Sequence, residues 1–180
     1  MTGLYGGVFD PPHNGHVALA AGAKREFAIP RLLVLVSENP GHKSTLSPAD
    51  IRLELARAAF PDDDVRLDPY PRTIDLLRGE RFDAPLFVLG ADEFCAFPSW
   101  KEPDEVVELA ELAVGTRPGF PRERLESVLD GLRRPERVHF FEIEPNPASS
   151  TAIRAGVAGE PLVPPAVAAL IRQFRLYTDS

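Results

Sequence analysis

Short apolar runs alternate with segments of helical periodicity along the whole chain. Each apolar run is short, as central strands usually are. The runs lie at residues 4–9, 32–37, 65–67, 86–89, 112–116 and 138–143. Because strand-like and helix-like segments alternate, the pattern predicts an α/β fold with a doubly wound, mainly parallel sheet of five to six strands and flanking helices.

Three segments between or after these runs carry helix signals. Residues 47–50 read Ser-Pro-Ala-Asp, with a capping serine, a proline at the first helical position and an acid three residues after the cap. They predict a helix that begins here and ends before Pro61. Apolar residues repeat at i, i+3, i+4 and i+7 in two further segments, 125–132 and 167–174, which we expect to be core-facing helices.

The length of the chain indicates one domain. With 180 residues, it can bury a core without disulfide bonds or metal ions. We see no internal repeat and no linker that would separate two halves. We therefore expect a single domain over residues 1–180, with a C-terminal helical segment from about 148 to 177. The loop 38–45 contains glycine, proline and serine, and we expect it to be the most mobile segment.

Charge and cysteine content limit the partners. The formal net charge of −7 argues against a nucleic-acid backbone as partner, because neutralising phosphates requires a surplus of Lys and Arg. Cys95 is the only cysteine, which excludes an internal disulfide framework and fits a reducing compartment. No apolar run approaches the about 20 residues of a membrane span. We therefore expect a cytoplasmic protein that binds neither nucleic acid nor a membrane.

An unusual turn follows the first predicted strand. Residues 6–16 read Gly-Gly-Val-Phe-Asp-Pro-Pro-His-Asn-Gly-His. The paired glycines carry no Cβ atom, so a ligand can approach their backbone closely. His13 and His16 stand three residues apart where Asn14 is expected to cap a helix, so both imidazoles would lie near one helix N-terminus. Such a terminus attracts anions, and imidazole donors beside it can hold phosphate oxygens.

This histidine pair has two other interpretations. Taken alone, two histidines in a turn more often fill the turn and cap a helix than bind a ligand. A zinc site would need further ligands, but only His42, His139 and Cys95 remain, and none stands at a ligand spacing. We therefore expect no metal ligands in the protein. Residues 6–16 as a whole are a more specific signal for a ligand site than either histidine alone.

A second candidate anion site lies at residues 149–154, which read Ser-Ser-Thr-Ala-Ile-Arg. Hydroxyl groups directly before a helix cap it or, together with its backbone N–H groups, bind phosphate. Arg154 stands one turn further on, and its planar guanidinium suits phosphate oxygens. Alone, this segment is also consistent with an ordinary serine cap and a solvated arginine.

Together the two segments resemble the signatures of the nucleotidylyltransferase superfamily, whose His-x-Gly-His element stands here at residues 13–16. The resemblance implies a Rossmann-like fold in which both histidines bind phosphates and stabilise the transition state, with no covalent nucleophile. It also implies that the second segment grips the β and γ phosphates, and that Phe9 lies near the nucleoside. The implied ATP-binding residues are Gly6, Gly7, Val8, Phe9, His13, His16, Ser150, Thr151 and Arg154.

The middle of the chain resembles bacterial nicotinate-nucleotide adenylyltransferases. His42-Lys43 resembles their Pro-x-His-Lys element, with Gly41 in place of the proline. Residues 70–77 resemble their Tyr-Thr-x-Asp-Thr-Leu stretch, in which Thr73 and Asp75 match. An apolar run that ends in Gly90-Ala91-Asp92, followed by Trp100 and by Arg117-Pro118-Gly119, is similar to the segments that line the mononucleotide pocket of that family. The implied mononucleotide-binding residues are Lys43, Thr73, Gly90, Asp92, Trp100 and Arg117, and the implied catalytic residues are His13, His16, Lys43 and Arg154.

Two of these residues have plainer interpretations when taken alone. Trp100 is the only tryptophan, and it suits either core packing or stacking on a flat pyridine ring. Arg117 fits a solvated surface charge. Asp92, at the carboxyl end of a buried strand, is well placed to hold ribose hydroxyls.

The resemblance implies an adenylyltransferase that joins ATP to a small phosphate monoester, which it also implies to be nicotinate mononucleotide. Mg²⁺ is expected to accompany ATP and bridge its phosphates, and no protein ligand is assigned to it. One alternative is an enzyme of the same fold that acts on another monoester, such as nicotinamide mononucleotide or phosphopantetheine. Another is a non-catalytic nucleotide-binding module. The choice between acid and amide, and between monomer and homo-oligomer, stays open.

Overall fold

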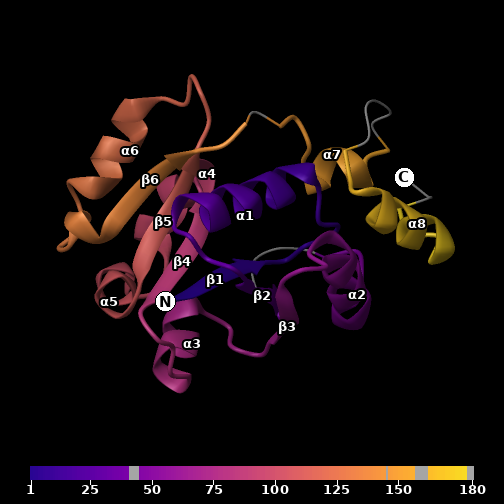
Figure 1. Cartoon of the computed structure of the whole chain (residues 1–180), viewed down its shortest axis with the longest axis horizontal. Coiled ribbons are helices and arrows are strands. Elements are labelled where there is room, and N and C mark those ends of the chain that lie inside the picture. The colour runs from indigo at the N-terminus through magenta and orange to yellow at the C-terminus, as the bar shows by residue number, and fades with distance from the viewer. Residues whose placement is uncertain (41–44, 145, 157–161, 178–180) are drawn as a thin grey trace.

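The computed structural model describes residues 1–40, 45–144, 146–156 and 162–177. Within these residues, six strands form one sheet in the order β3-β2-β1-β4-β5-β6, and each neighbouring pair is parallel (Figure 1). The predicted α/β fold is therefore confirmed. The strands are β1 (Thr2–Gly7), β2 (Leu32–Ser37), β3 (Asp64–Asp68), β4 (Pro85–Gly90), β5 (Glu111–Thr116) and β6 (Val138–Glu142).

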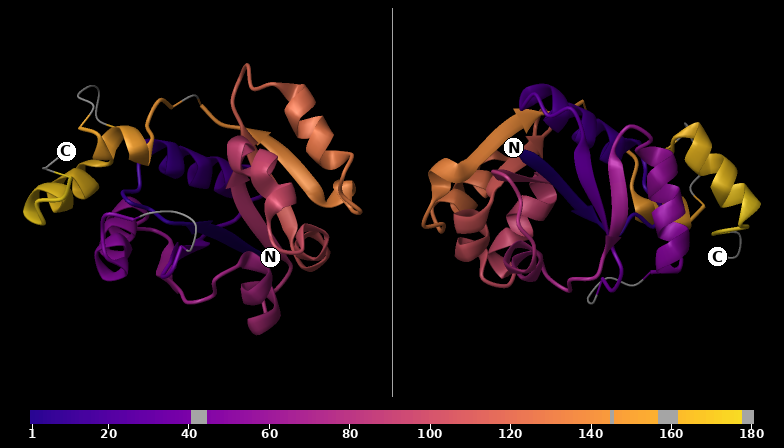
Figure 2. Two further views of the ribbon diagram at one scale, coloured as in Figure 1. Left: turned by 180° about the vertical axis from the view of Figure 1, so that it is seen from behind. Right: turned by 60° about the horizontal axis from the view of Figure 1, so that its bottom comes forward.

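Helices cover both faces of this sheet, as the two views of Figure 2 show. In the part of the chain that the structure describes, none of them is long and apolar enough to cross a membrane. The helices are α1 (Asn14–Glu26), α2 (Ala49–Ala59), α3 (Thr73–Gly79), α4 (Ala91–Ala96), α5 (Pro103–Leu109), α6 (Arg122–Leu129), α7 (Ser150–Arg154) and α8 (Pro165–Gln173), with short 3₁₀ turns η1 (Phe97–Ser99) and η2 (Pro135–Arg137).

Alternate side chains of a central strand join different hydrophobic clusters. In β4, Leu86 and Val88 pack in the cluster that includes α1 and α2, whereas Phe87 and Leu89 pack in the cluster that includes α3 to α6. All four side chains are 5% exposed or less. Since successive side chains of a strand point to opposite faces, such a strand must be apolar at every position. This burial explains the continuous apolar runs in the sequence.

The strand order creates a crevice at the carboxyl ends of the sheet. The chain runs outward from β1 through β2 to β3 and then returns to place β4 on the other side of β1. In open α/β sheets, ligands bind outside the carboxyl ends of the strands at such a reversal. Here β1 ends at Gly7 and β4 ends at Gly90. Both glycines belong to the segments that the sequence assigns to ligand binding.

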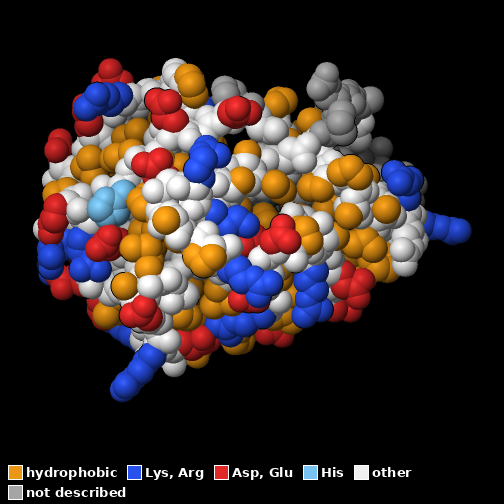
Figure 3. Space-filling model, in the orientation of Figure 1, with side chains coloured by type: hydrophobic (Ala, Val, Ile, Leu, Met, Phe, Trp, Pro, Cys, Tyr) orange, Lys and Arg blue, Asp and Glu red, His pale blue; other side chains and the backbone are white. Residues whose placement is uncertain are grey.

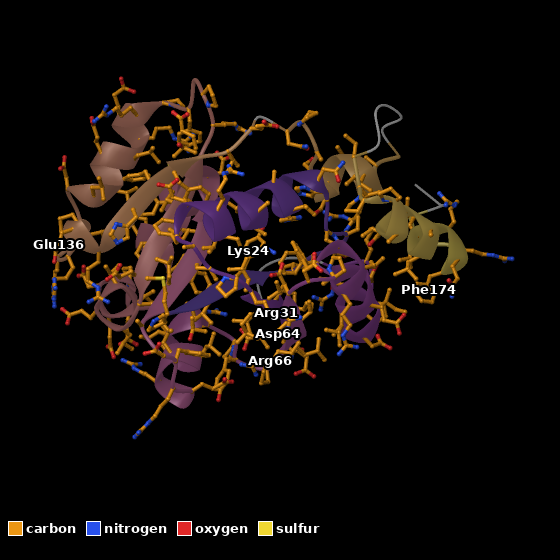
Figure 4. The ribbon with its side chains drawn as sticks, in the orientation of Figure 1. Lys24, Arg31, Asp64, Arg66, Glu136 and Phe174 are labelled. Atoms are coloured by element: carbon orange, nitrogen blue, oxygen red, sulfur yellow. The ribbon has the colours of Figure 1, made fainter. Side chains whose placement is uncertain are left out.

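Ion pairs tie elements together at the opposite, amino edge of the sheet. Asp63 is almost fully buried, and both its carboxylate oxygens lie 2.9 Å from the Lys24 Nζ of α1. One of them also accepts a 3.0 Å hydrogen bond from the backbone N–H of Leu32, where β2 begins. Arg31 pairs with Asp64 at 3.3 Å, and Figure 4 labels several of these charges. In the same orientation, Figure 3 shows Lys and Arg side chains mixed with Asp and Glu side chains on the face of the molecule that is turned toward the viewer.

Helix α2 lacks the serine cap predicted from the sequence. The helix begins at Ala49 with Pro48 at the cap position, and no side chain caps its N-terminus. The Ser47 side chain is buried, and its hydroxyl lies 3.0 Å from the Tyr177 hydroxyl. The prediction of a capping serine was therefore wrong, because Ser47 makes a tertiary contact instead.

Two other caps were assigned from the sequence, with different outcomes. Helix α1 begins at Asn14, and His13 takes the cap position that was predicted for Asn14. At α7, the Ser149 hydroxyl accepts a 3.1 Å hydrogen bond from the backbone N–H of Ala152, so the serine cap, one of the two interpretations of this segment, is present, and phosphate binding by the segment stays a prediction.

Candidate active site

A cavity of about 1030 Å³ opens at the carboxyl ends of β1 and β4. Its volume lies at the upper end of the range for small-molecule sites, so it has room for a nucleotide and a second substrate. It is lined by residues from both ends of the chain and from its middle. Among the residues predicted from the sequence, those that line it are Gly6, Gly7, Val8, Phe9, His13, His16, Thr73, Gly90, Asp92, Trp100, Arg117, Ser150, Thr151 and Arg154. Lys43 lies outside the residues that the structure describes.

The two histidines lie against each other at the N-terminus of α1. Their ring centroids are 3.7 Å apart. The backbone N–H of His13 donates a 3.1 Å hydrogen bond to Nδ1 of His16. Because this bond uses the Nδ1 lone pair, a neutral His16 carries its proton on Nε2. His16 therefore offers its Nε2–H as a hydrogen-bond donor.

Burial determines the charge of His13. Desolvation lowers the pKa of its imidazole to about 4, from an ordinary value of 6.5. His13 is therefore neutral near pH 7 and contributes an N–H dipole rather than a full positive charge. A Cβ atom on Gly15 would lie 3.0 Å from both Cε1 and Nδ1 of His13, so the glycine leaves room for this ring.

The paired glycines of β1 leave room for two phenylalanine rings, in addition to the ligand access that the sequence suggested. A Cβ atom on Gly7 would lie 2.7 Å from Cζ of Phe9, and one on Gly6 would lie 3.1 Å from Cζ of Phe87. Phe9 has a φ of 52°, in the left-handed region, and its ring is 2% exposed. That ring packs edge-on against His16, with the centroids 5.2 Å apart. The resemblance implied that Phe9 lies near the nucleoside. In the structure its buried ring packs against His16.

Helix α7 docks directly on the loop that precedes α1 (Figure 1). The Arg154 Nη1 donates a 2.7 Å hydrogen bond to the backbone carbonyl oxygen of Asp10. The Ser150 hydroxyl donates a 2.9 Å hydrogen bond to the carbonyl oxygen of Pro11. Thr151, on the same helix, is exposed and lines the cavity. The two predicted anion-binding segments therefore lie side by side at one cavity.

Asp10 organises this loop from the inside, a role that the sequence analysis did not assign. Its side chain is 1% exposed. It accepts hydrogen bonds from the backbone N–H groups of Leu46 (2.7 Å) and Ser47 (3.3 Å) and from the Tyr177 hydroxyl (2.6 Å). Burial by itself would raise the pKa of Asp10, but these hydrogen bonds outweigh it and lower the pKa. Asp10 is therefore a buried carboxylate that stays ionised.

Arg52 is a second organising residue that the sequence analysis missed. It is 1% exposed, and its guanidinium donates to backbone carbonyl oxygens directly after β1, at and directly after the end of β2, and before α2. Burial lowers the pKa of Arg52, while the charge of nearby Asp10 acts in the opposite direction. The acceptors are the carbonyl oxygens of Val8 (2.9 Å), Ser37 (2.7 Å), Glu38 (3.2 Å) and Ser47 (3.1 Å).

The far end of the cavity carries the residues assigned to the mononucleotide. Trp100 is half-buried and lies edge-on to Phe87, with ring centroids 6.0 Å apart and an interplanar angle of 89°. Thr73 begins α3, and Gly90 is the residue before α4. Asp92 and Arg117 are both exposed and form a loose 3.5 Å ion pair.

Lys101 is a further cation on the cavity wall that was not singled out from the sequence. It lines the cavity next to Trp100. Its Nζ lies 2.8 Å from the Asp75 carboxylate of α3. The ion pair therefore joins α3 to the segment that carries the tryptophan. The basic charge of Lys101 gave no signal by itself, because surface lysines are common.

Comparison with known proteins identifies the family of the chain. A model of the cytidylyltransferase-like family matches residues 4–156. A probable nicotinate-nucleotide adenylyltransferase of Chlorobaculum parvum is 32% identical over 196 residues, which cover 98% of each chain. The chain belongs to the nicotinate-nucleotide adenylyltransferase family. Another probable nicotinate-nucleotide adenylyltransferase, from Desulfitobacterium hafniense, is 34% identical over 200 residues, with 97% of this chain and 94% of the relative covered.

Solved structures support the family fold. The nicotinic acid mononucleotide adenylyltransferase of Plasmodium falciparum complexed with NaAD superposes with a TM-score of 0.75 at 20% identity, covering 99% of this chain and 98% of the other. The same enzyme complexed with APC gives a TM-score of 0.73 at 19% identity. At this identity, the similarity establishes the Rossmann-like fold of this adenylyltransferase family member and no more.

Proposed function

We propose that the protein transfers the adenylyl group of ATP to nicotinate mononucleotide, forming nicotinate adenine dinucleotide and pyrophosphate. The observation that carries this proposal is a single cavity bordered at one end by His13, His16 and Arg154 and at the other by Trp100. Family membership points to the same reaction. Residues 1–180 act in this proposal as one nucleotidylyltransferase domain.

The reaction is an in-line displacement at the α-phosphorus of ATP. A phosphate oxygen of the mononucleotide forms the new bond to this phosphorus, and the bond to the bridging oxygen of pyrophosphate breaks. No general base is needed, because the attacking phosphate is already deprotonated. The work of the protein is to align two anions and to compensate their charge.

We assign this work to the groups at the first end of the cavity. His16 donates from Nε2 to an α-phosphate oxygen, and neutral His13 adds a second N–H dipole beside the N-terminus of α1. Ser150, Thr151 and Arg154 receive the departing pyrophosphate. Lys43 is proposed to add a further positive charge to the phosphates.

The mononucleotide occupies the other end in this proposal. Trp100 stacks on the pyridine ring, and Asp92 accepts hydrogen bonds from ribose hydroxyls. Thr73, Gly90 and Arg117 complete the wall. The cavity also suits other flat bases, so the preference for the acid is proposed from the family and not from a particular contact.

We propose that Mg²⁺ enters this site as a partner of ATP. Among the described residues, no three His, Cys, Asp or Glu side chains come together as metal ligands. Asp10, the carboxylate closest in sequence to the histidines, is buried and already accepts hydrogen bonds from the protein. We therefore propose that Mg²⁺ is held by the phosphates of ATP and by water, where it neutralises charge on the leaving group. We also propose a cytoplasmic location, which suits a chain with a single cysteine.

A pyrophosphate-release assay tests the proposed function. Purified protein is supplied with MgATP and, in separate reactions, with nicotinate mononucleotide, nicotinamide mononucleotide or phosphopantetheine. We expect turnover with nicotinate mononucleotide, at a kcat/KM at least about tenfold above that for the amide. Comparable values for acid and amide would contradict the assigned substrate. ATP binding without pyrophosphate release from any pair would identify a non-catalytic module instead.

A further inference from the structure

The last described residues of the chain contact the loop that precedes α1. Helix α8 packs against α2, and Val167, Leu170 and Leu176 belong to the same hydrophobic cluster as the buried face of α2. Beyond this helix, the Tyr177 hydroxyl donates a 2.6 Å hydrogen bond to Oδ1 of Asp10. This hydrogen bond joins two residues that are 167 positions apart in the sequence.

The Tyr177 hydroxyl lies at the centre of a buried polar cluster. It is 3.0 Å from the Ser47 hydroxyl as well as 2.6 Å from Asp10. Burial raises the pKa of the Tyr177 phenol, and the hydrogen bond to Asp10 acts in the same direction. The phenol therefore stays protonated and remains a donor. Because Asp10 is a buried anion, losing this donor would leave part of its charge uncompensated.

The backbone at this point is held in a conformation that it would not adopt without support. Tyr177 has a φ of 60° and Arg175 has a φ of 52°. Both are side-chain-bearing residues in the left-handed region, where such residues are uncommon. Such a conformation persists only when the surroundings determine it. The packing of Leu176 and the hydrogen bonds of Tyr177 provide that support.

Asp10 connects this cluster to both phosphate-binding segments. Its backbone carbonyl accepts the hydrogen bond from Arg154, while its carboxylate accepts the one from Tyr177. The next residue, Pro11, accepts the Ser150 hydroxyl. A shift of Asp10 would therefore move the α7 contacts and the approach to the histidines together.

We propose that Tyr177 is a positioning residue for adenylyl transfer: its hydroxyl holds Asp10 and so keeps His13 and His16, at the N-terminus of α1, aligned with Arg154 on a shared ATP. Tyr177 acts through Asp10 and touches no reacting atom. This inference rests on the proposed function, since it assumes that ATP binds between these two segments.

The variant Tyr177→Phe tests the proposal, because it keeps the ring and removes only the hydroxyl. A hydrogen bond to a charged group stabilises by about 1.5–3 kcal/mol, so we expect kcat/KM for ATP to fall about tenfold to a hundredfold. The KM for the mononucleotide should change less than about twofold, since the Trp100 end of the cavity is not touched. An unchanged kcat/KM for ATP in the folded variant would overturn the proposal.

Thr116→Val is the matched control. It also removes a partly buried hydroxyl, one that donates over 3.2 Å to the backbone carbonyl of Phe141. Thr116→Val should lower Tm by about 2–4 °C and Tyr177→Phe by at least as much, but only Tyr177→Phe should change the kinetics for ATP. If both variants have a lower Tm and neither changes kcat/KM for ATP, Tyr177 has only a structural role.

A double-mutant cycle tests whether the effect passes through Asp10. If it does, adding Tyr177→Phe to Asp10→Asn should reduce kcat/KM for ATP by less than about twofold. Independent losses that multiply would contradict the pathway. Should Asp10→Asn fail to fold, hydrogen exchange of the backbone amides of Phe9, Asp10 and His13 in Tyr177→Phe decides the question, and protection equal to the wild type would overturn the proposal.

Calorimetric titration of ATP distinguishes this proposal from the proposed function. If the wild-type protein releases no pyrophosphate with any monoester, the proposed function fails. The positioning role is then read from ATP affinity, for which Tyr177→Phe should raise Kd by about tenfold or more. Equal Kd values for wild type and variant would overturn it.

Discussion

The guanidinium of Arg154 donates a 2.7 Å hydrogen bond to the backbone carbonyl oxygen of Asp10, 144 positions earlier in the chain. This bond places the cation of α7 beside the loop that leads into α1, at whose N-terminus both histidines lie. An arginine held in this way approaches a phosphate in a defined orientation, and its fork shape is not reproduced by lysine. The contact therefore makes the identity of residue 154 as important as its charge.

We expect Arg154→Ala to lower kcat by about 10²–10³, the usual loss when one transition-state donor is removed. Arg154→Lys should recover only part of this loss, since it keeps the charge but loses the fork. Steady-state kinetics with ATP varied are the measurement. Arg172→Ala, on the exposed side of α8, is the control and should match the wild type. Full activity in Arg154→Lys would show that charge alone matters.

His16→Ala should also reduce kcat by about 10²–10³, because it removes the donor proposed to face the α-phosphate. Its ring packs on Phe9, so a loss of about 1 kcal/mol in stability is expected as well. Single-turnover rates at saturating substrate separate the two effects. The control is His139→Ala, since His139 is half-exposed and does not line the cavity. Its Nε2 lies 2.7 Å from the Glu111 carboxylate. Unchanged turnover in His16→Ala would exclude the assigned role.

Arg52→Met should destabilise the protein by about 3–5 kcal/mol, the cost that follows when one partner of a buried charged network is removed. The substitution keeps apolar volume but leaves the carbonyl oxygens of Val8 and Ser37 without their donor. Urea unfolding monitored by circular dichroism measures this loss. Arg57→Met is the matched control, because Arg57 is exposed on the same helix and should change the free energy of unfolding by less than about 0.5 kcal/mol. Equal stabilities for the two variants would contradict the role of Arg52.

The buried charges explain why the sequence predicted the fold better than the network behind the site. The strands were recognisable because burial on both faces requires continuous apolar runs, as in β4. In α2, by contrast, Arg52 stands on the buried face at i, with Leu55, Ala56 and Ala59 at i+3, i+4 and i+7. A cation on an apolar stripe is a signal for a buried arginine. It becomes meaningful only when distant carbonyl oxygens are seen to converge on it.

The same limit applies to local signals that a distant residue overrides. Ser47 fits a helix cap by its neighbours in sequence, but Tyr177 lies 130 positions later and is 3.0 Å from its hydroxyl. The glycines of β1 were interpreted as access for a ligand, and the positions of the Phe9 and Phe87 rings add a packing reason. Residues of both motifs do lie on the wall of one cavity, among them His13, His16 and Arg154. Their catalytic roles stay predictions.

Trp100→Ala should raise the KM for the mononucleotide about tenfold or more, because it removes the ring proposed to stack on pyridine. The KM for ATP should change little, since the histidines and Arg154 lie at the other end of the cavity. Trp100→Phe keeps an aromatic ring and should retain most of the affinity. If both variants bind the mononucleotide as the wild type does, Trp100 serves only to pack against Phe87.

The neutral state of His13 predicts how stability depends on pH. Burial lowers the pKa of His13 to about 4 in the folded protein, whereas the unfolded chain titrates near the ordinary value of 6.5. Between these values the unfolded state binds the proton and the folded state does not, so stability is lost as the pH falls from about 6.5 toward 4. Above about pH 7 this contribution is fully present. The shift corresponds to a loss on the order of 3 kcal/mol at the acid end.

Comparison with His13→Gln separates the contribution of His13 to the free energy of unfolding from that of the carboxylates, which titrate in both proteins. Glutamine has no proton to gain, so its free energy of unfolding should decline less between pH 7 and pH 4 than that of the wild type. The difference between the two urea-unfolding profiles should grow as the pH falls and level off near the folded-state pKa of about 4. Parallel profiles would mean that His13 has the same pKa in both states. In that case His13 would be partly protonated near pH 6.5 and would meet the phosphates of ATP as a cation rather than as a neutral donor.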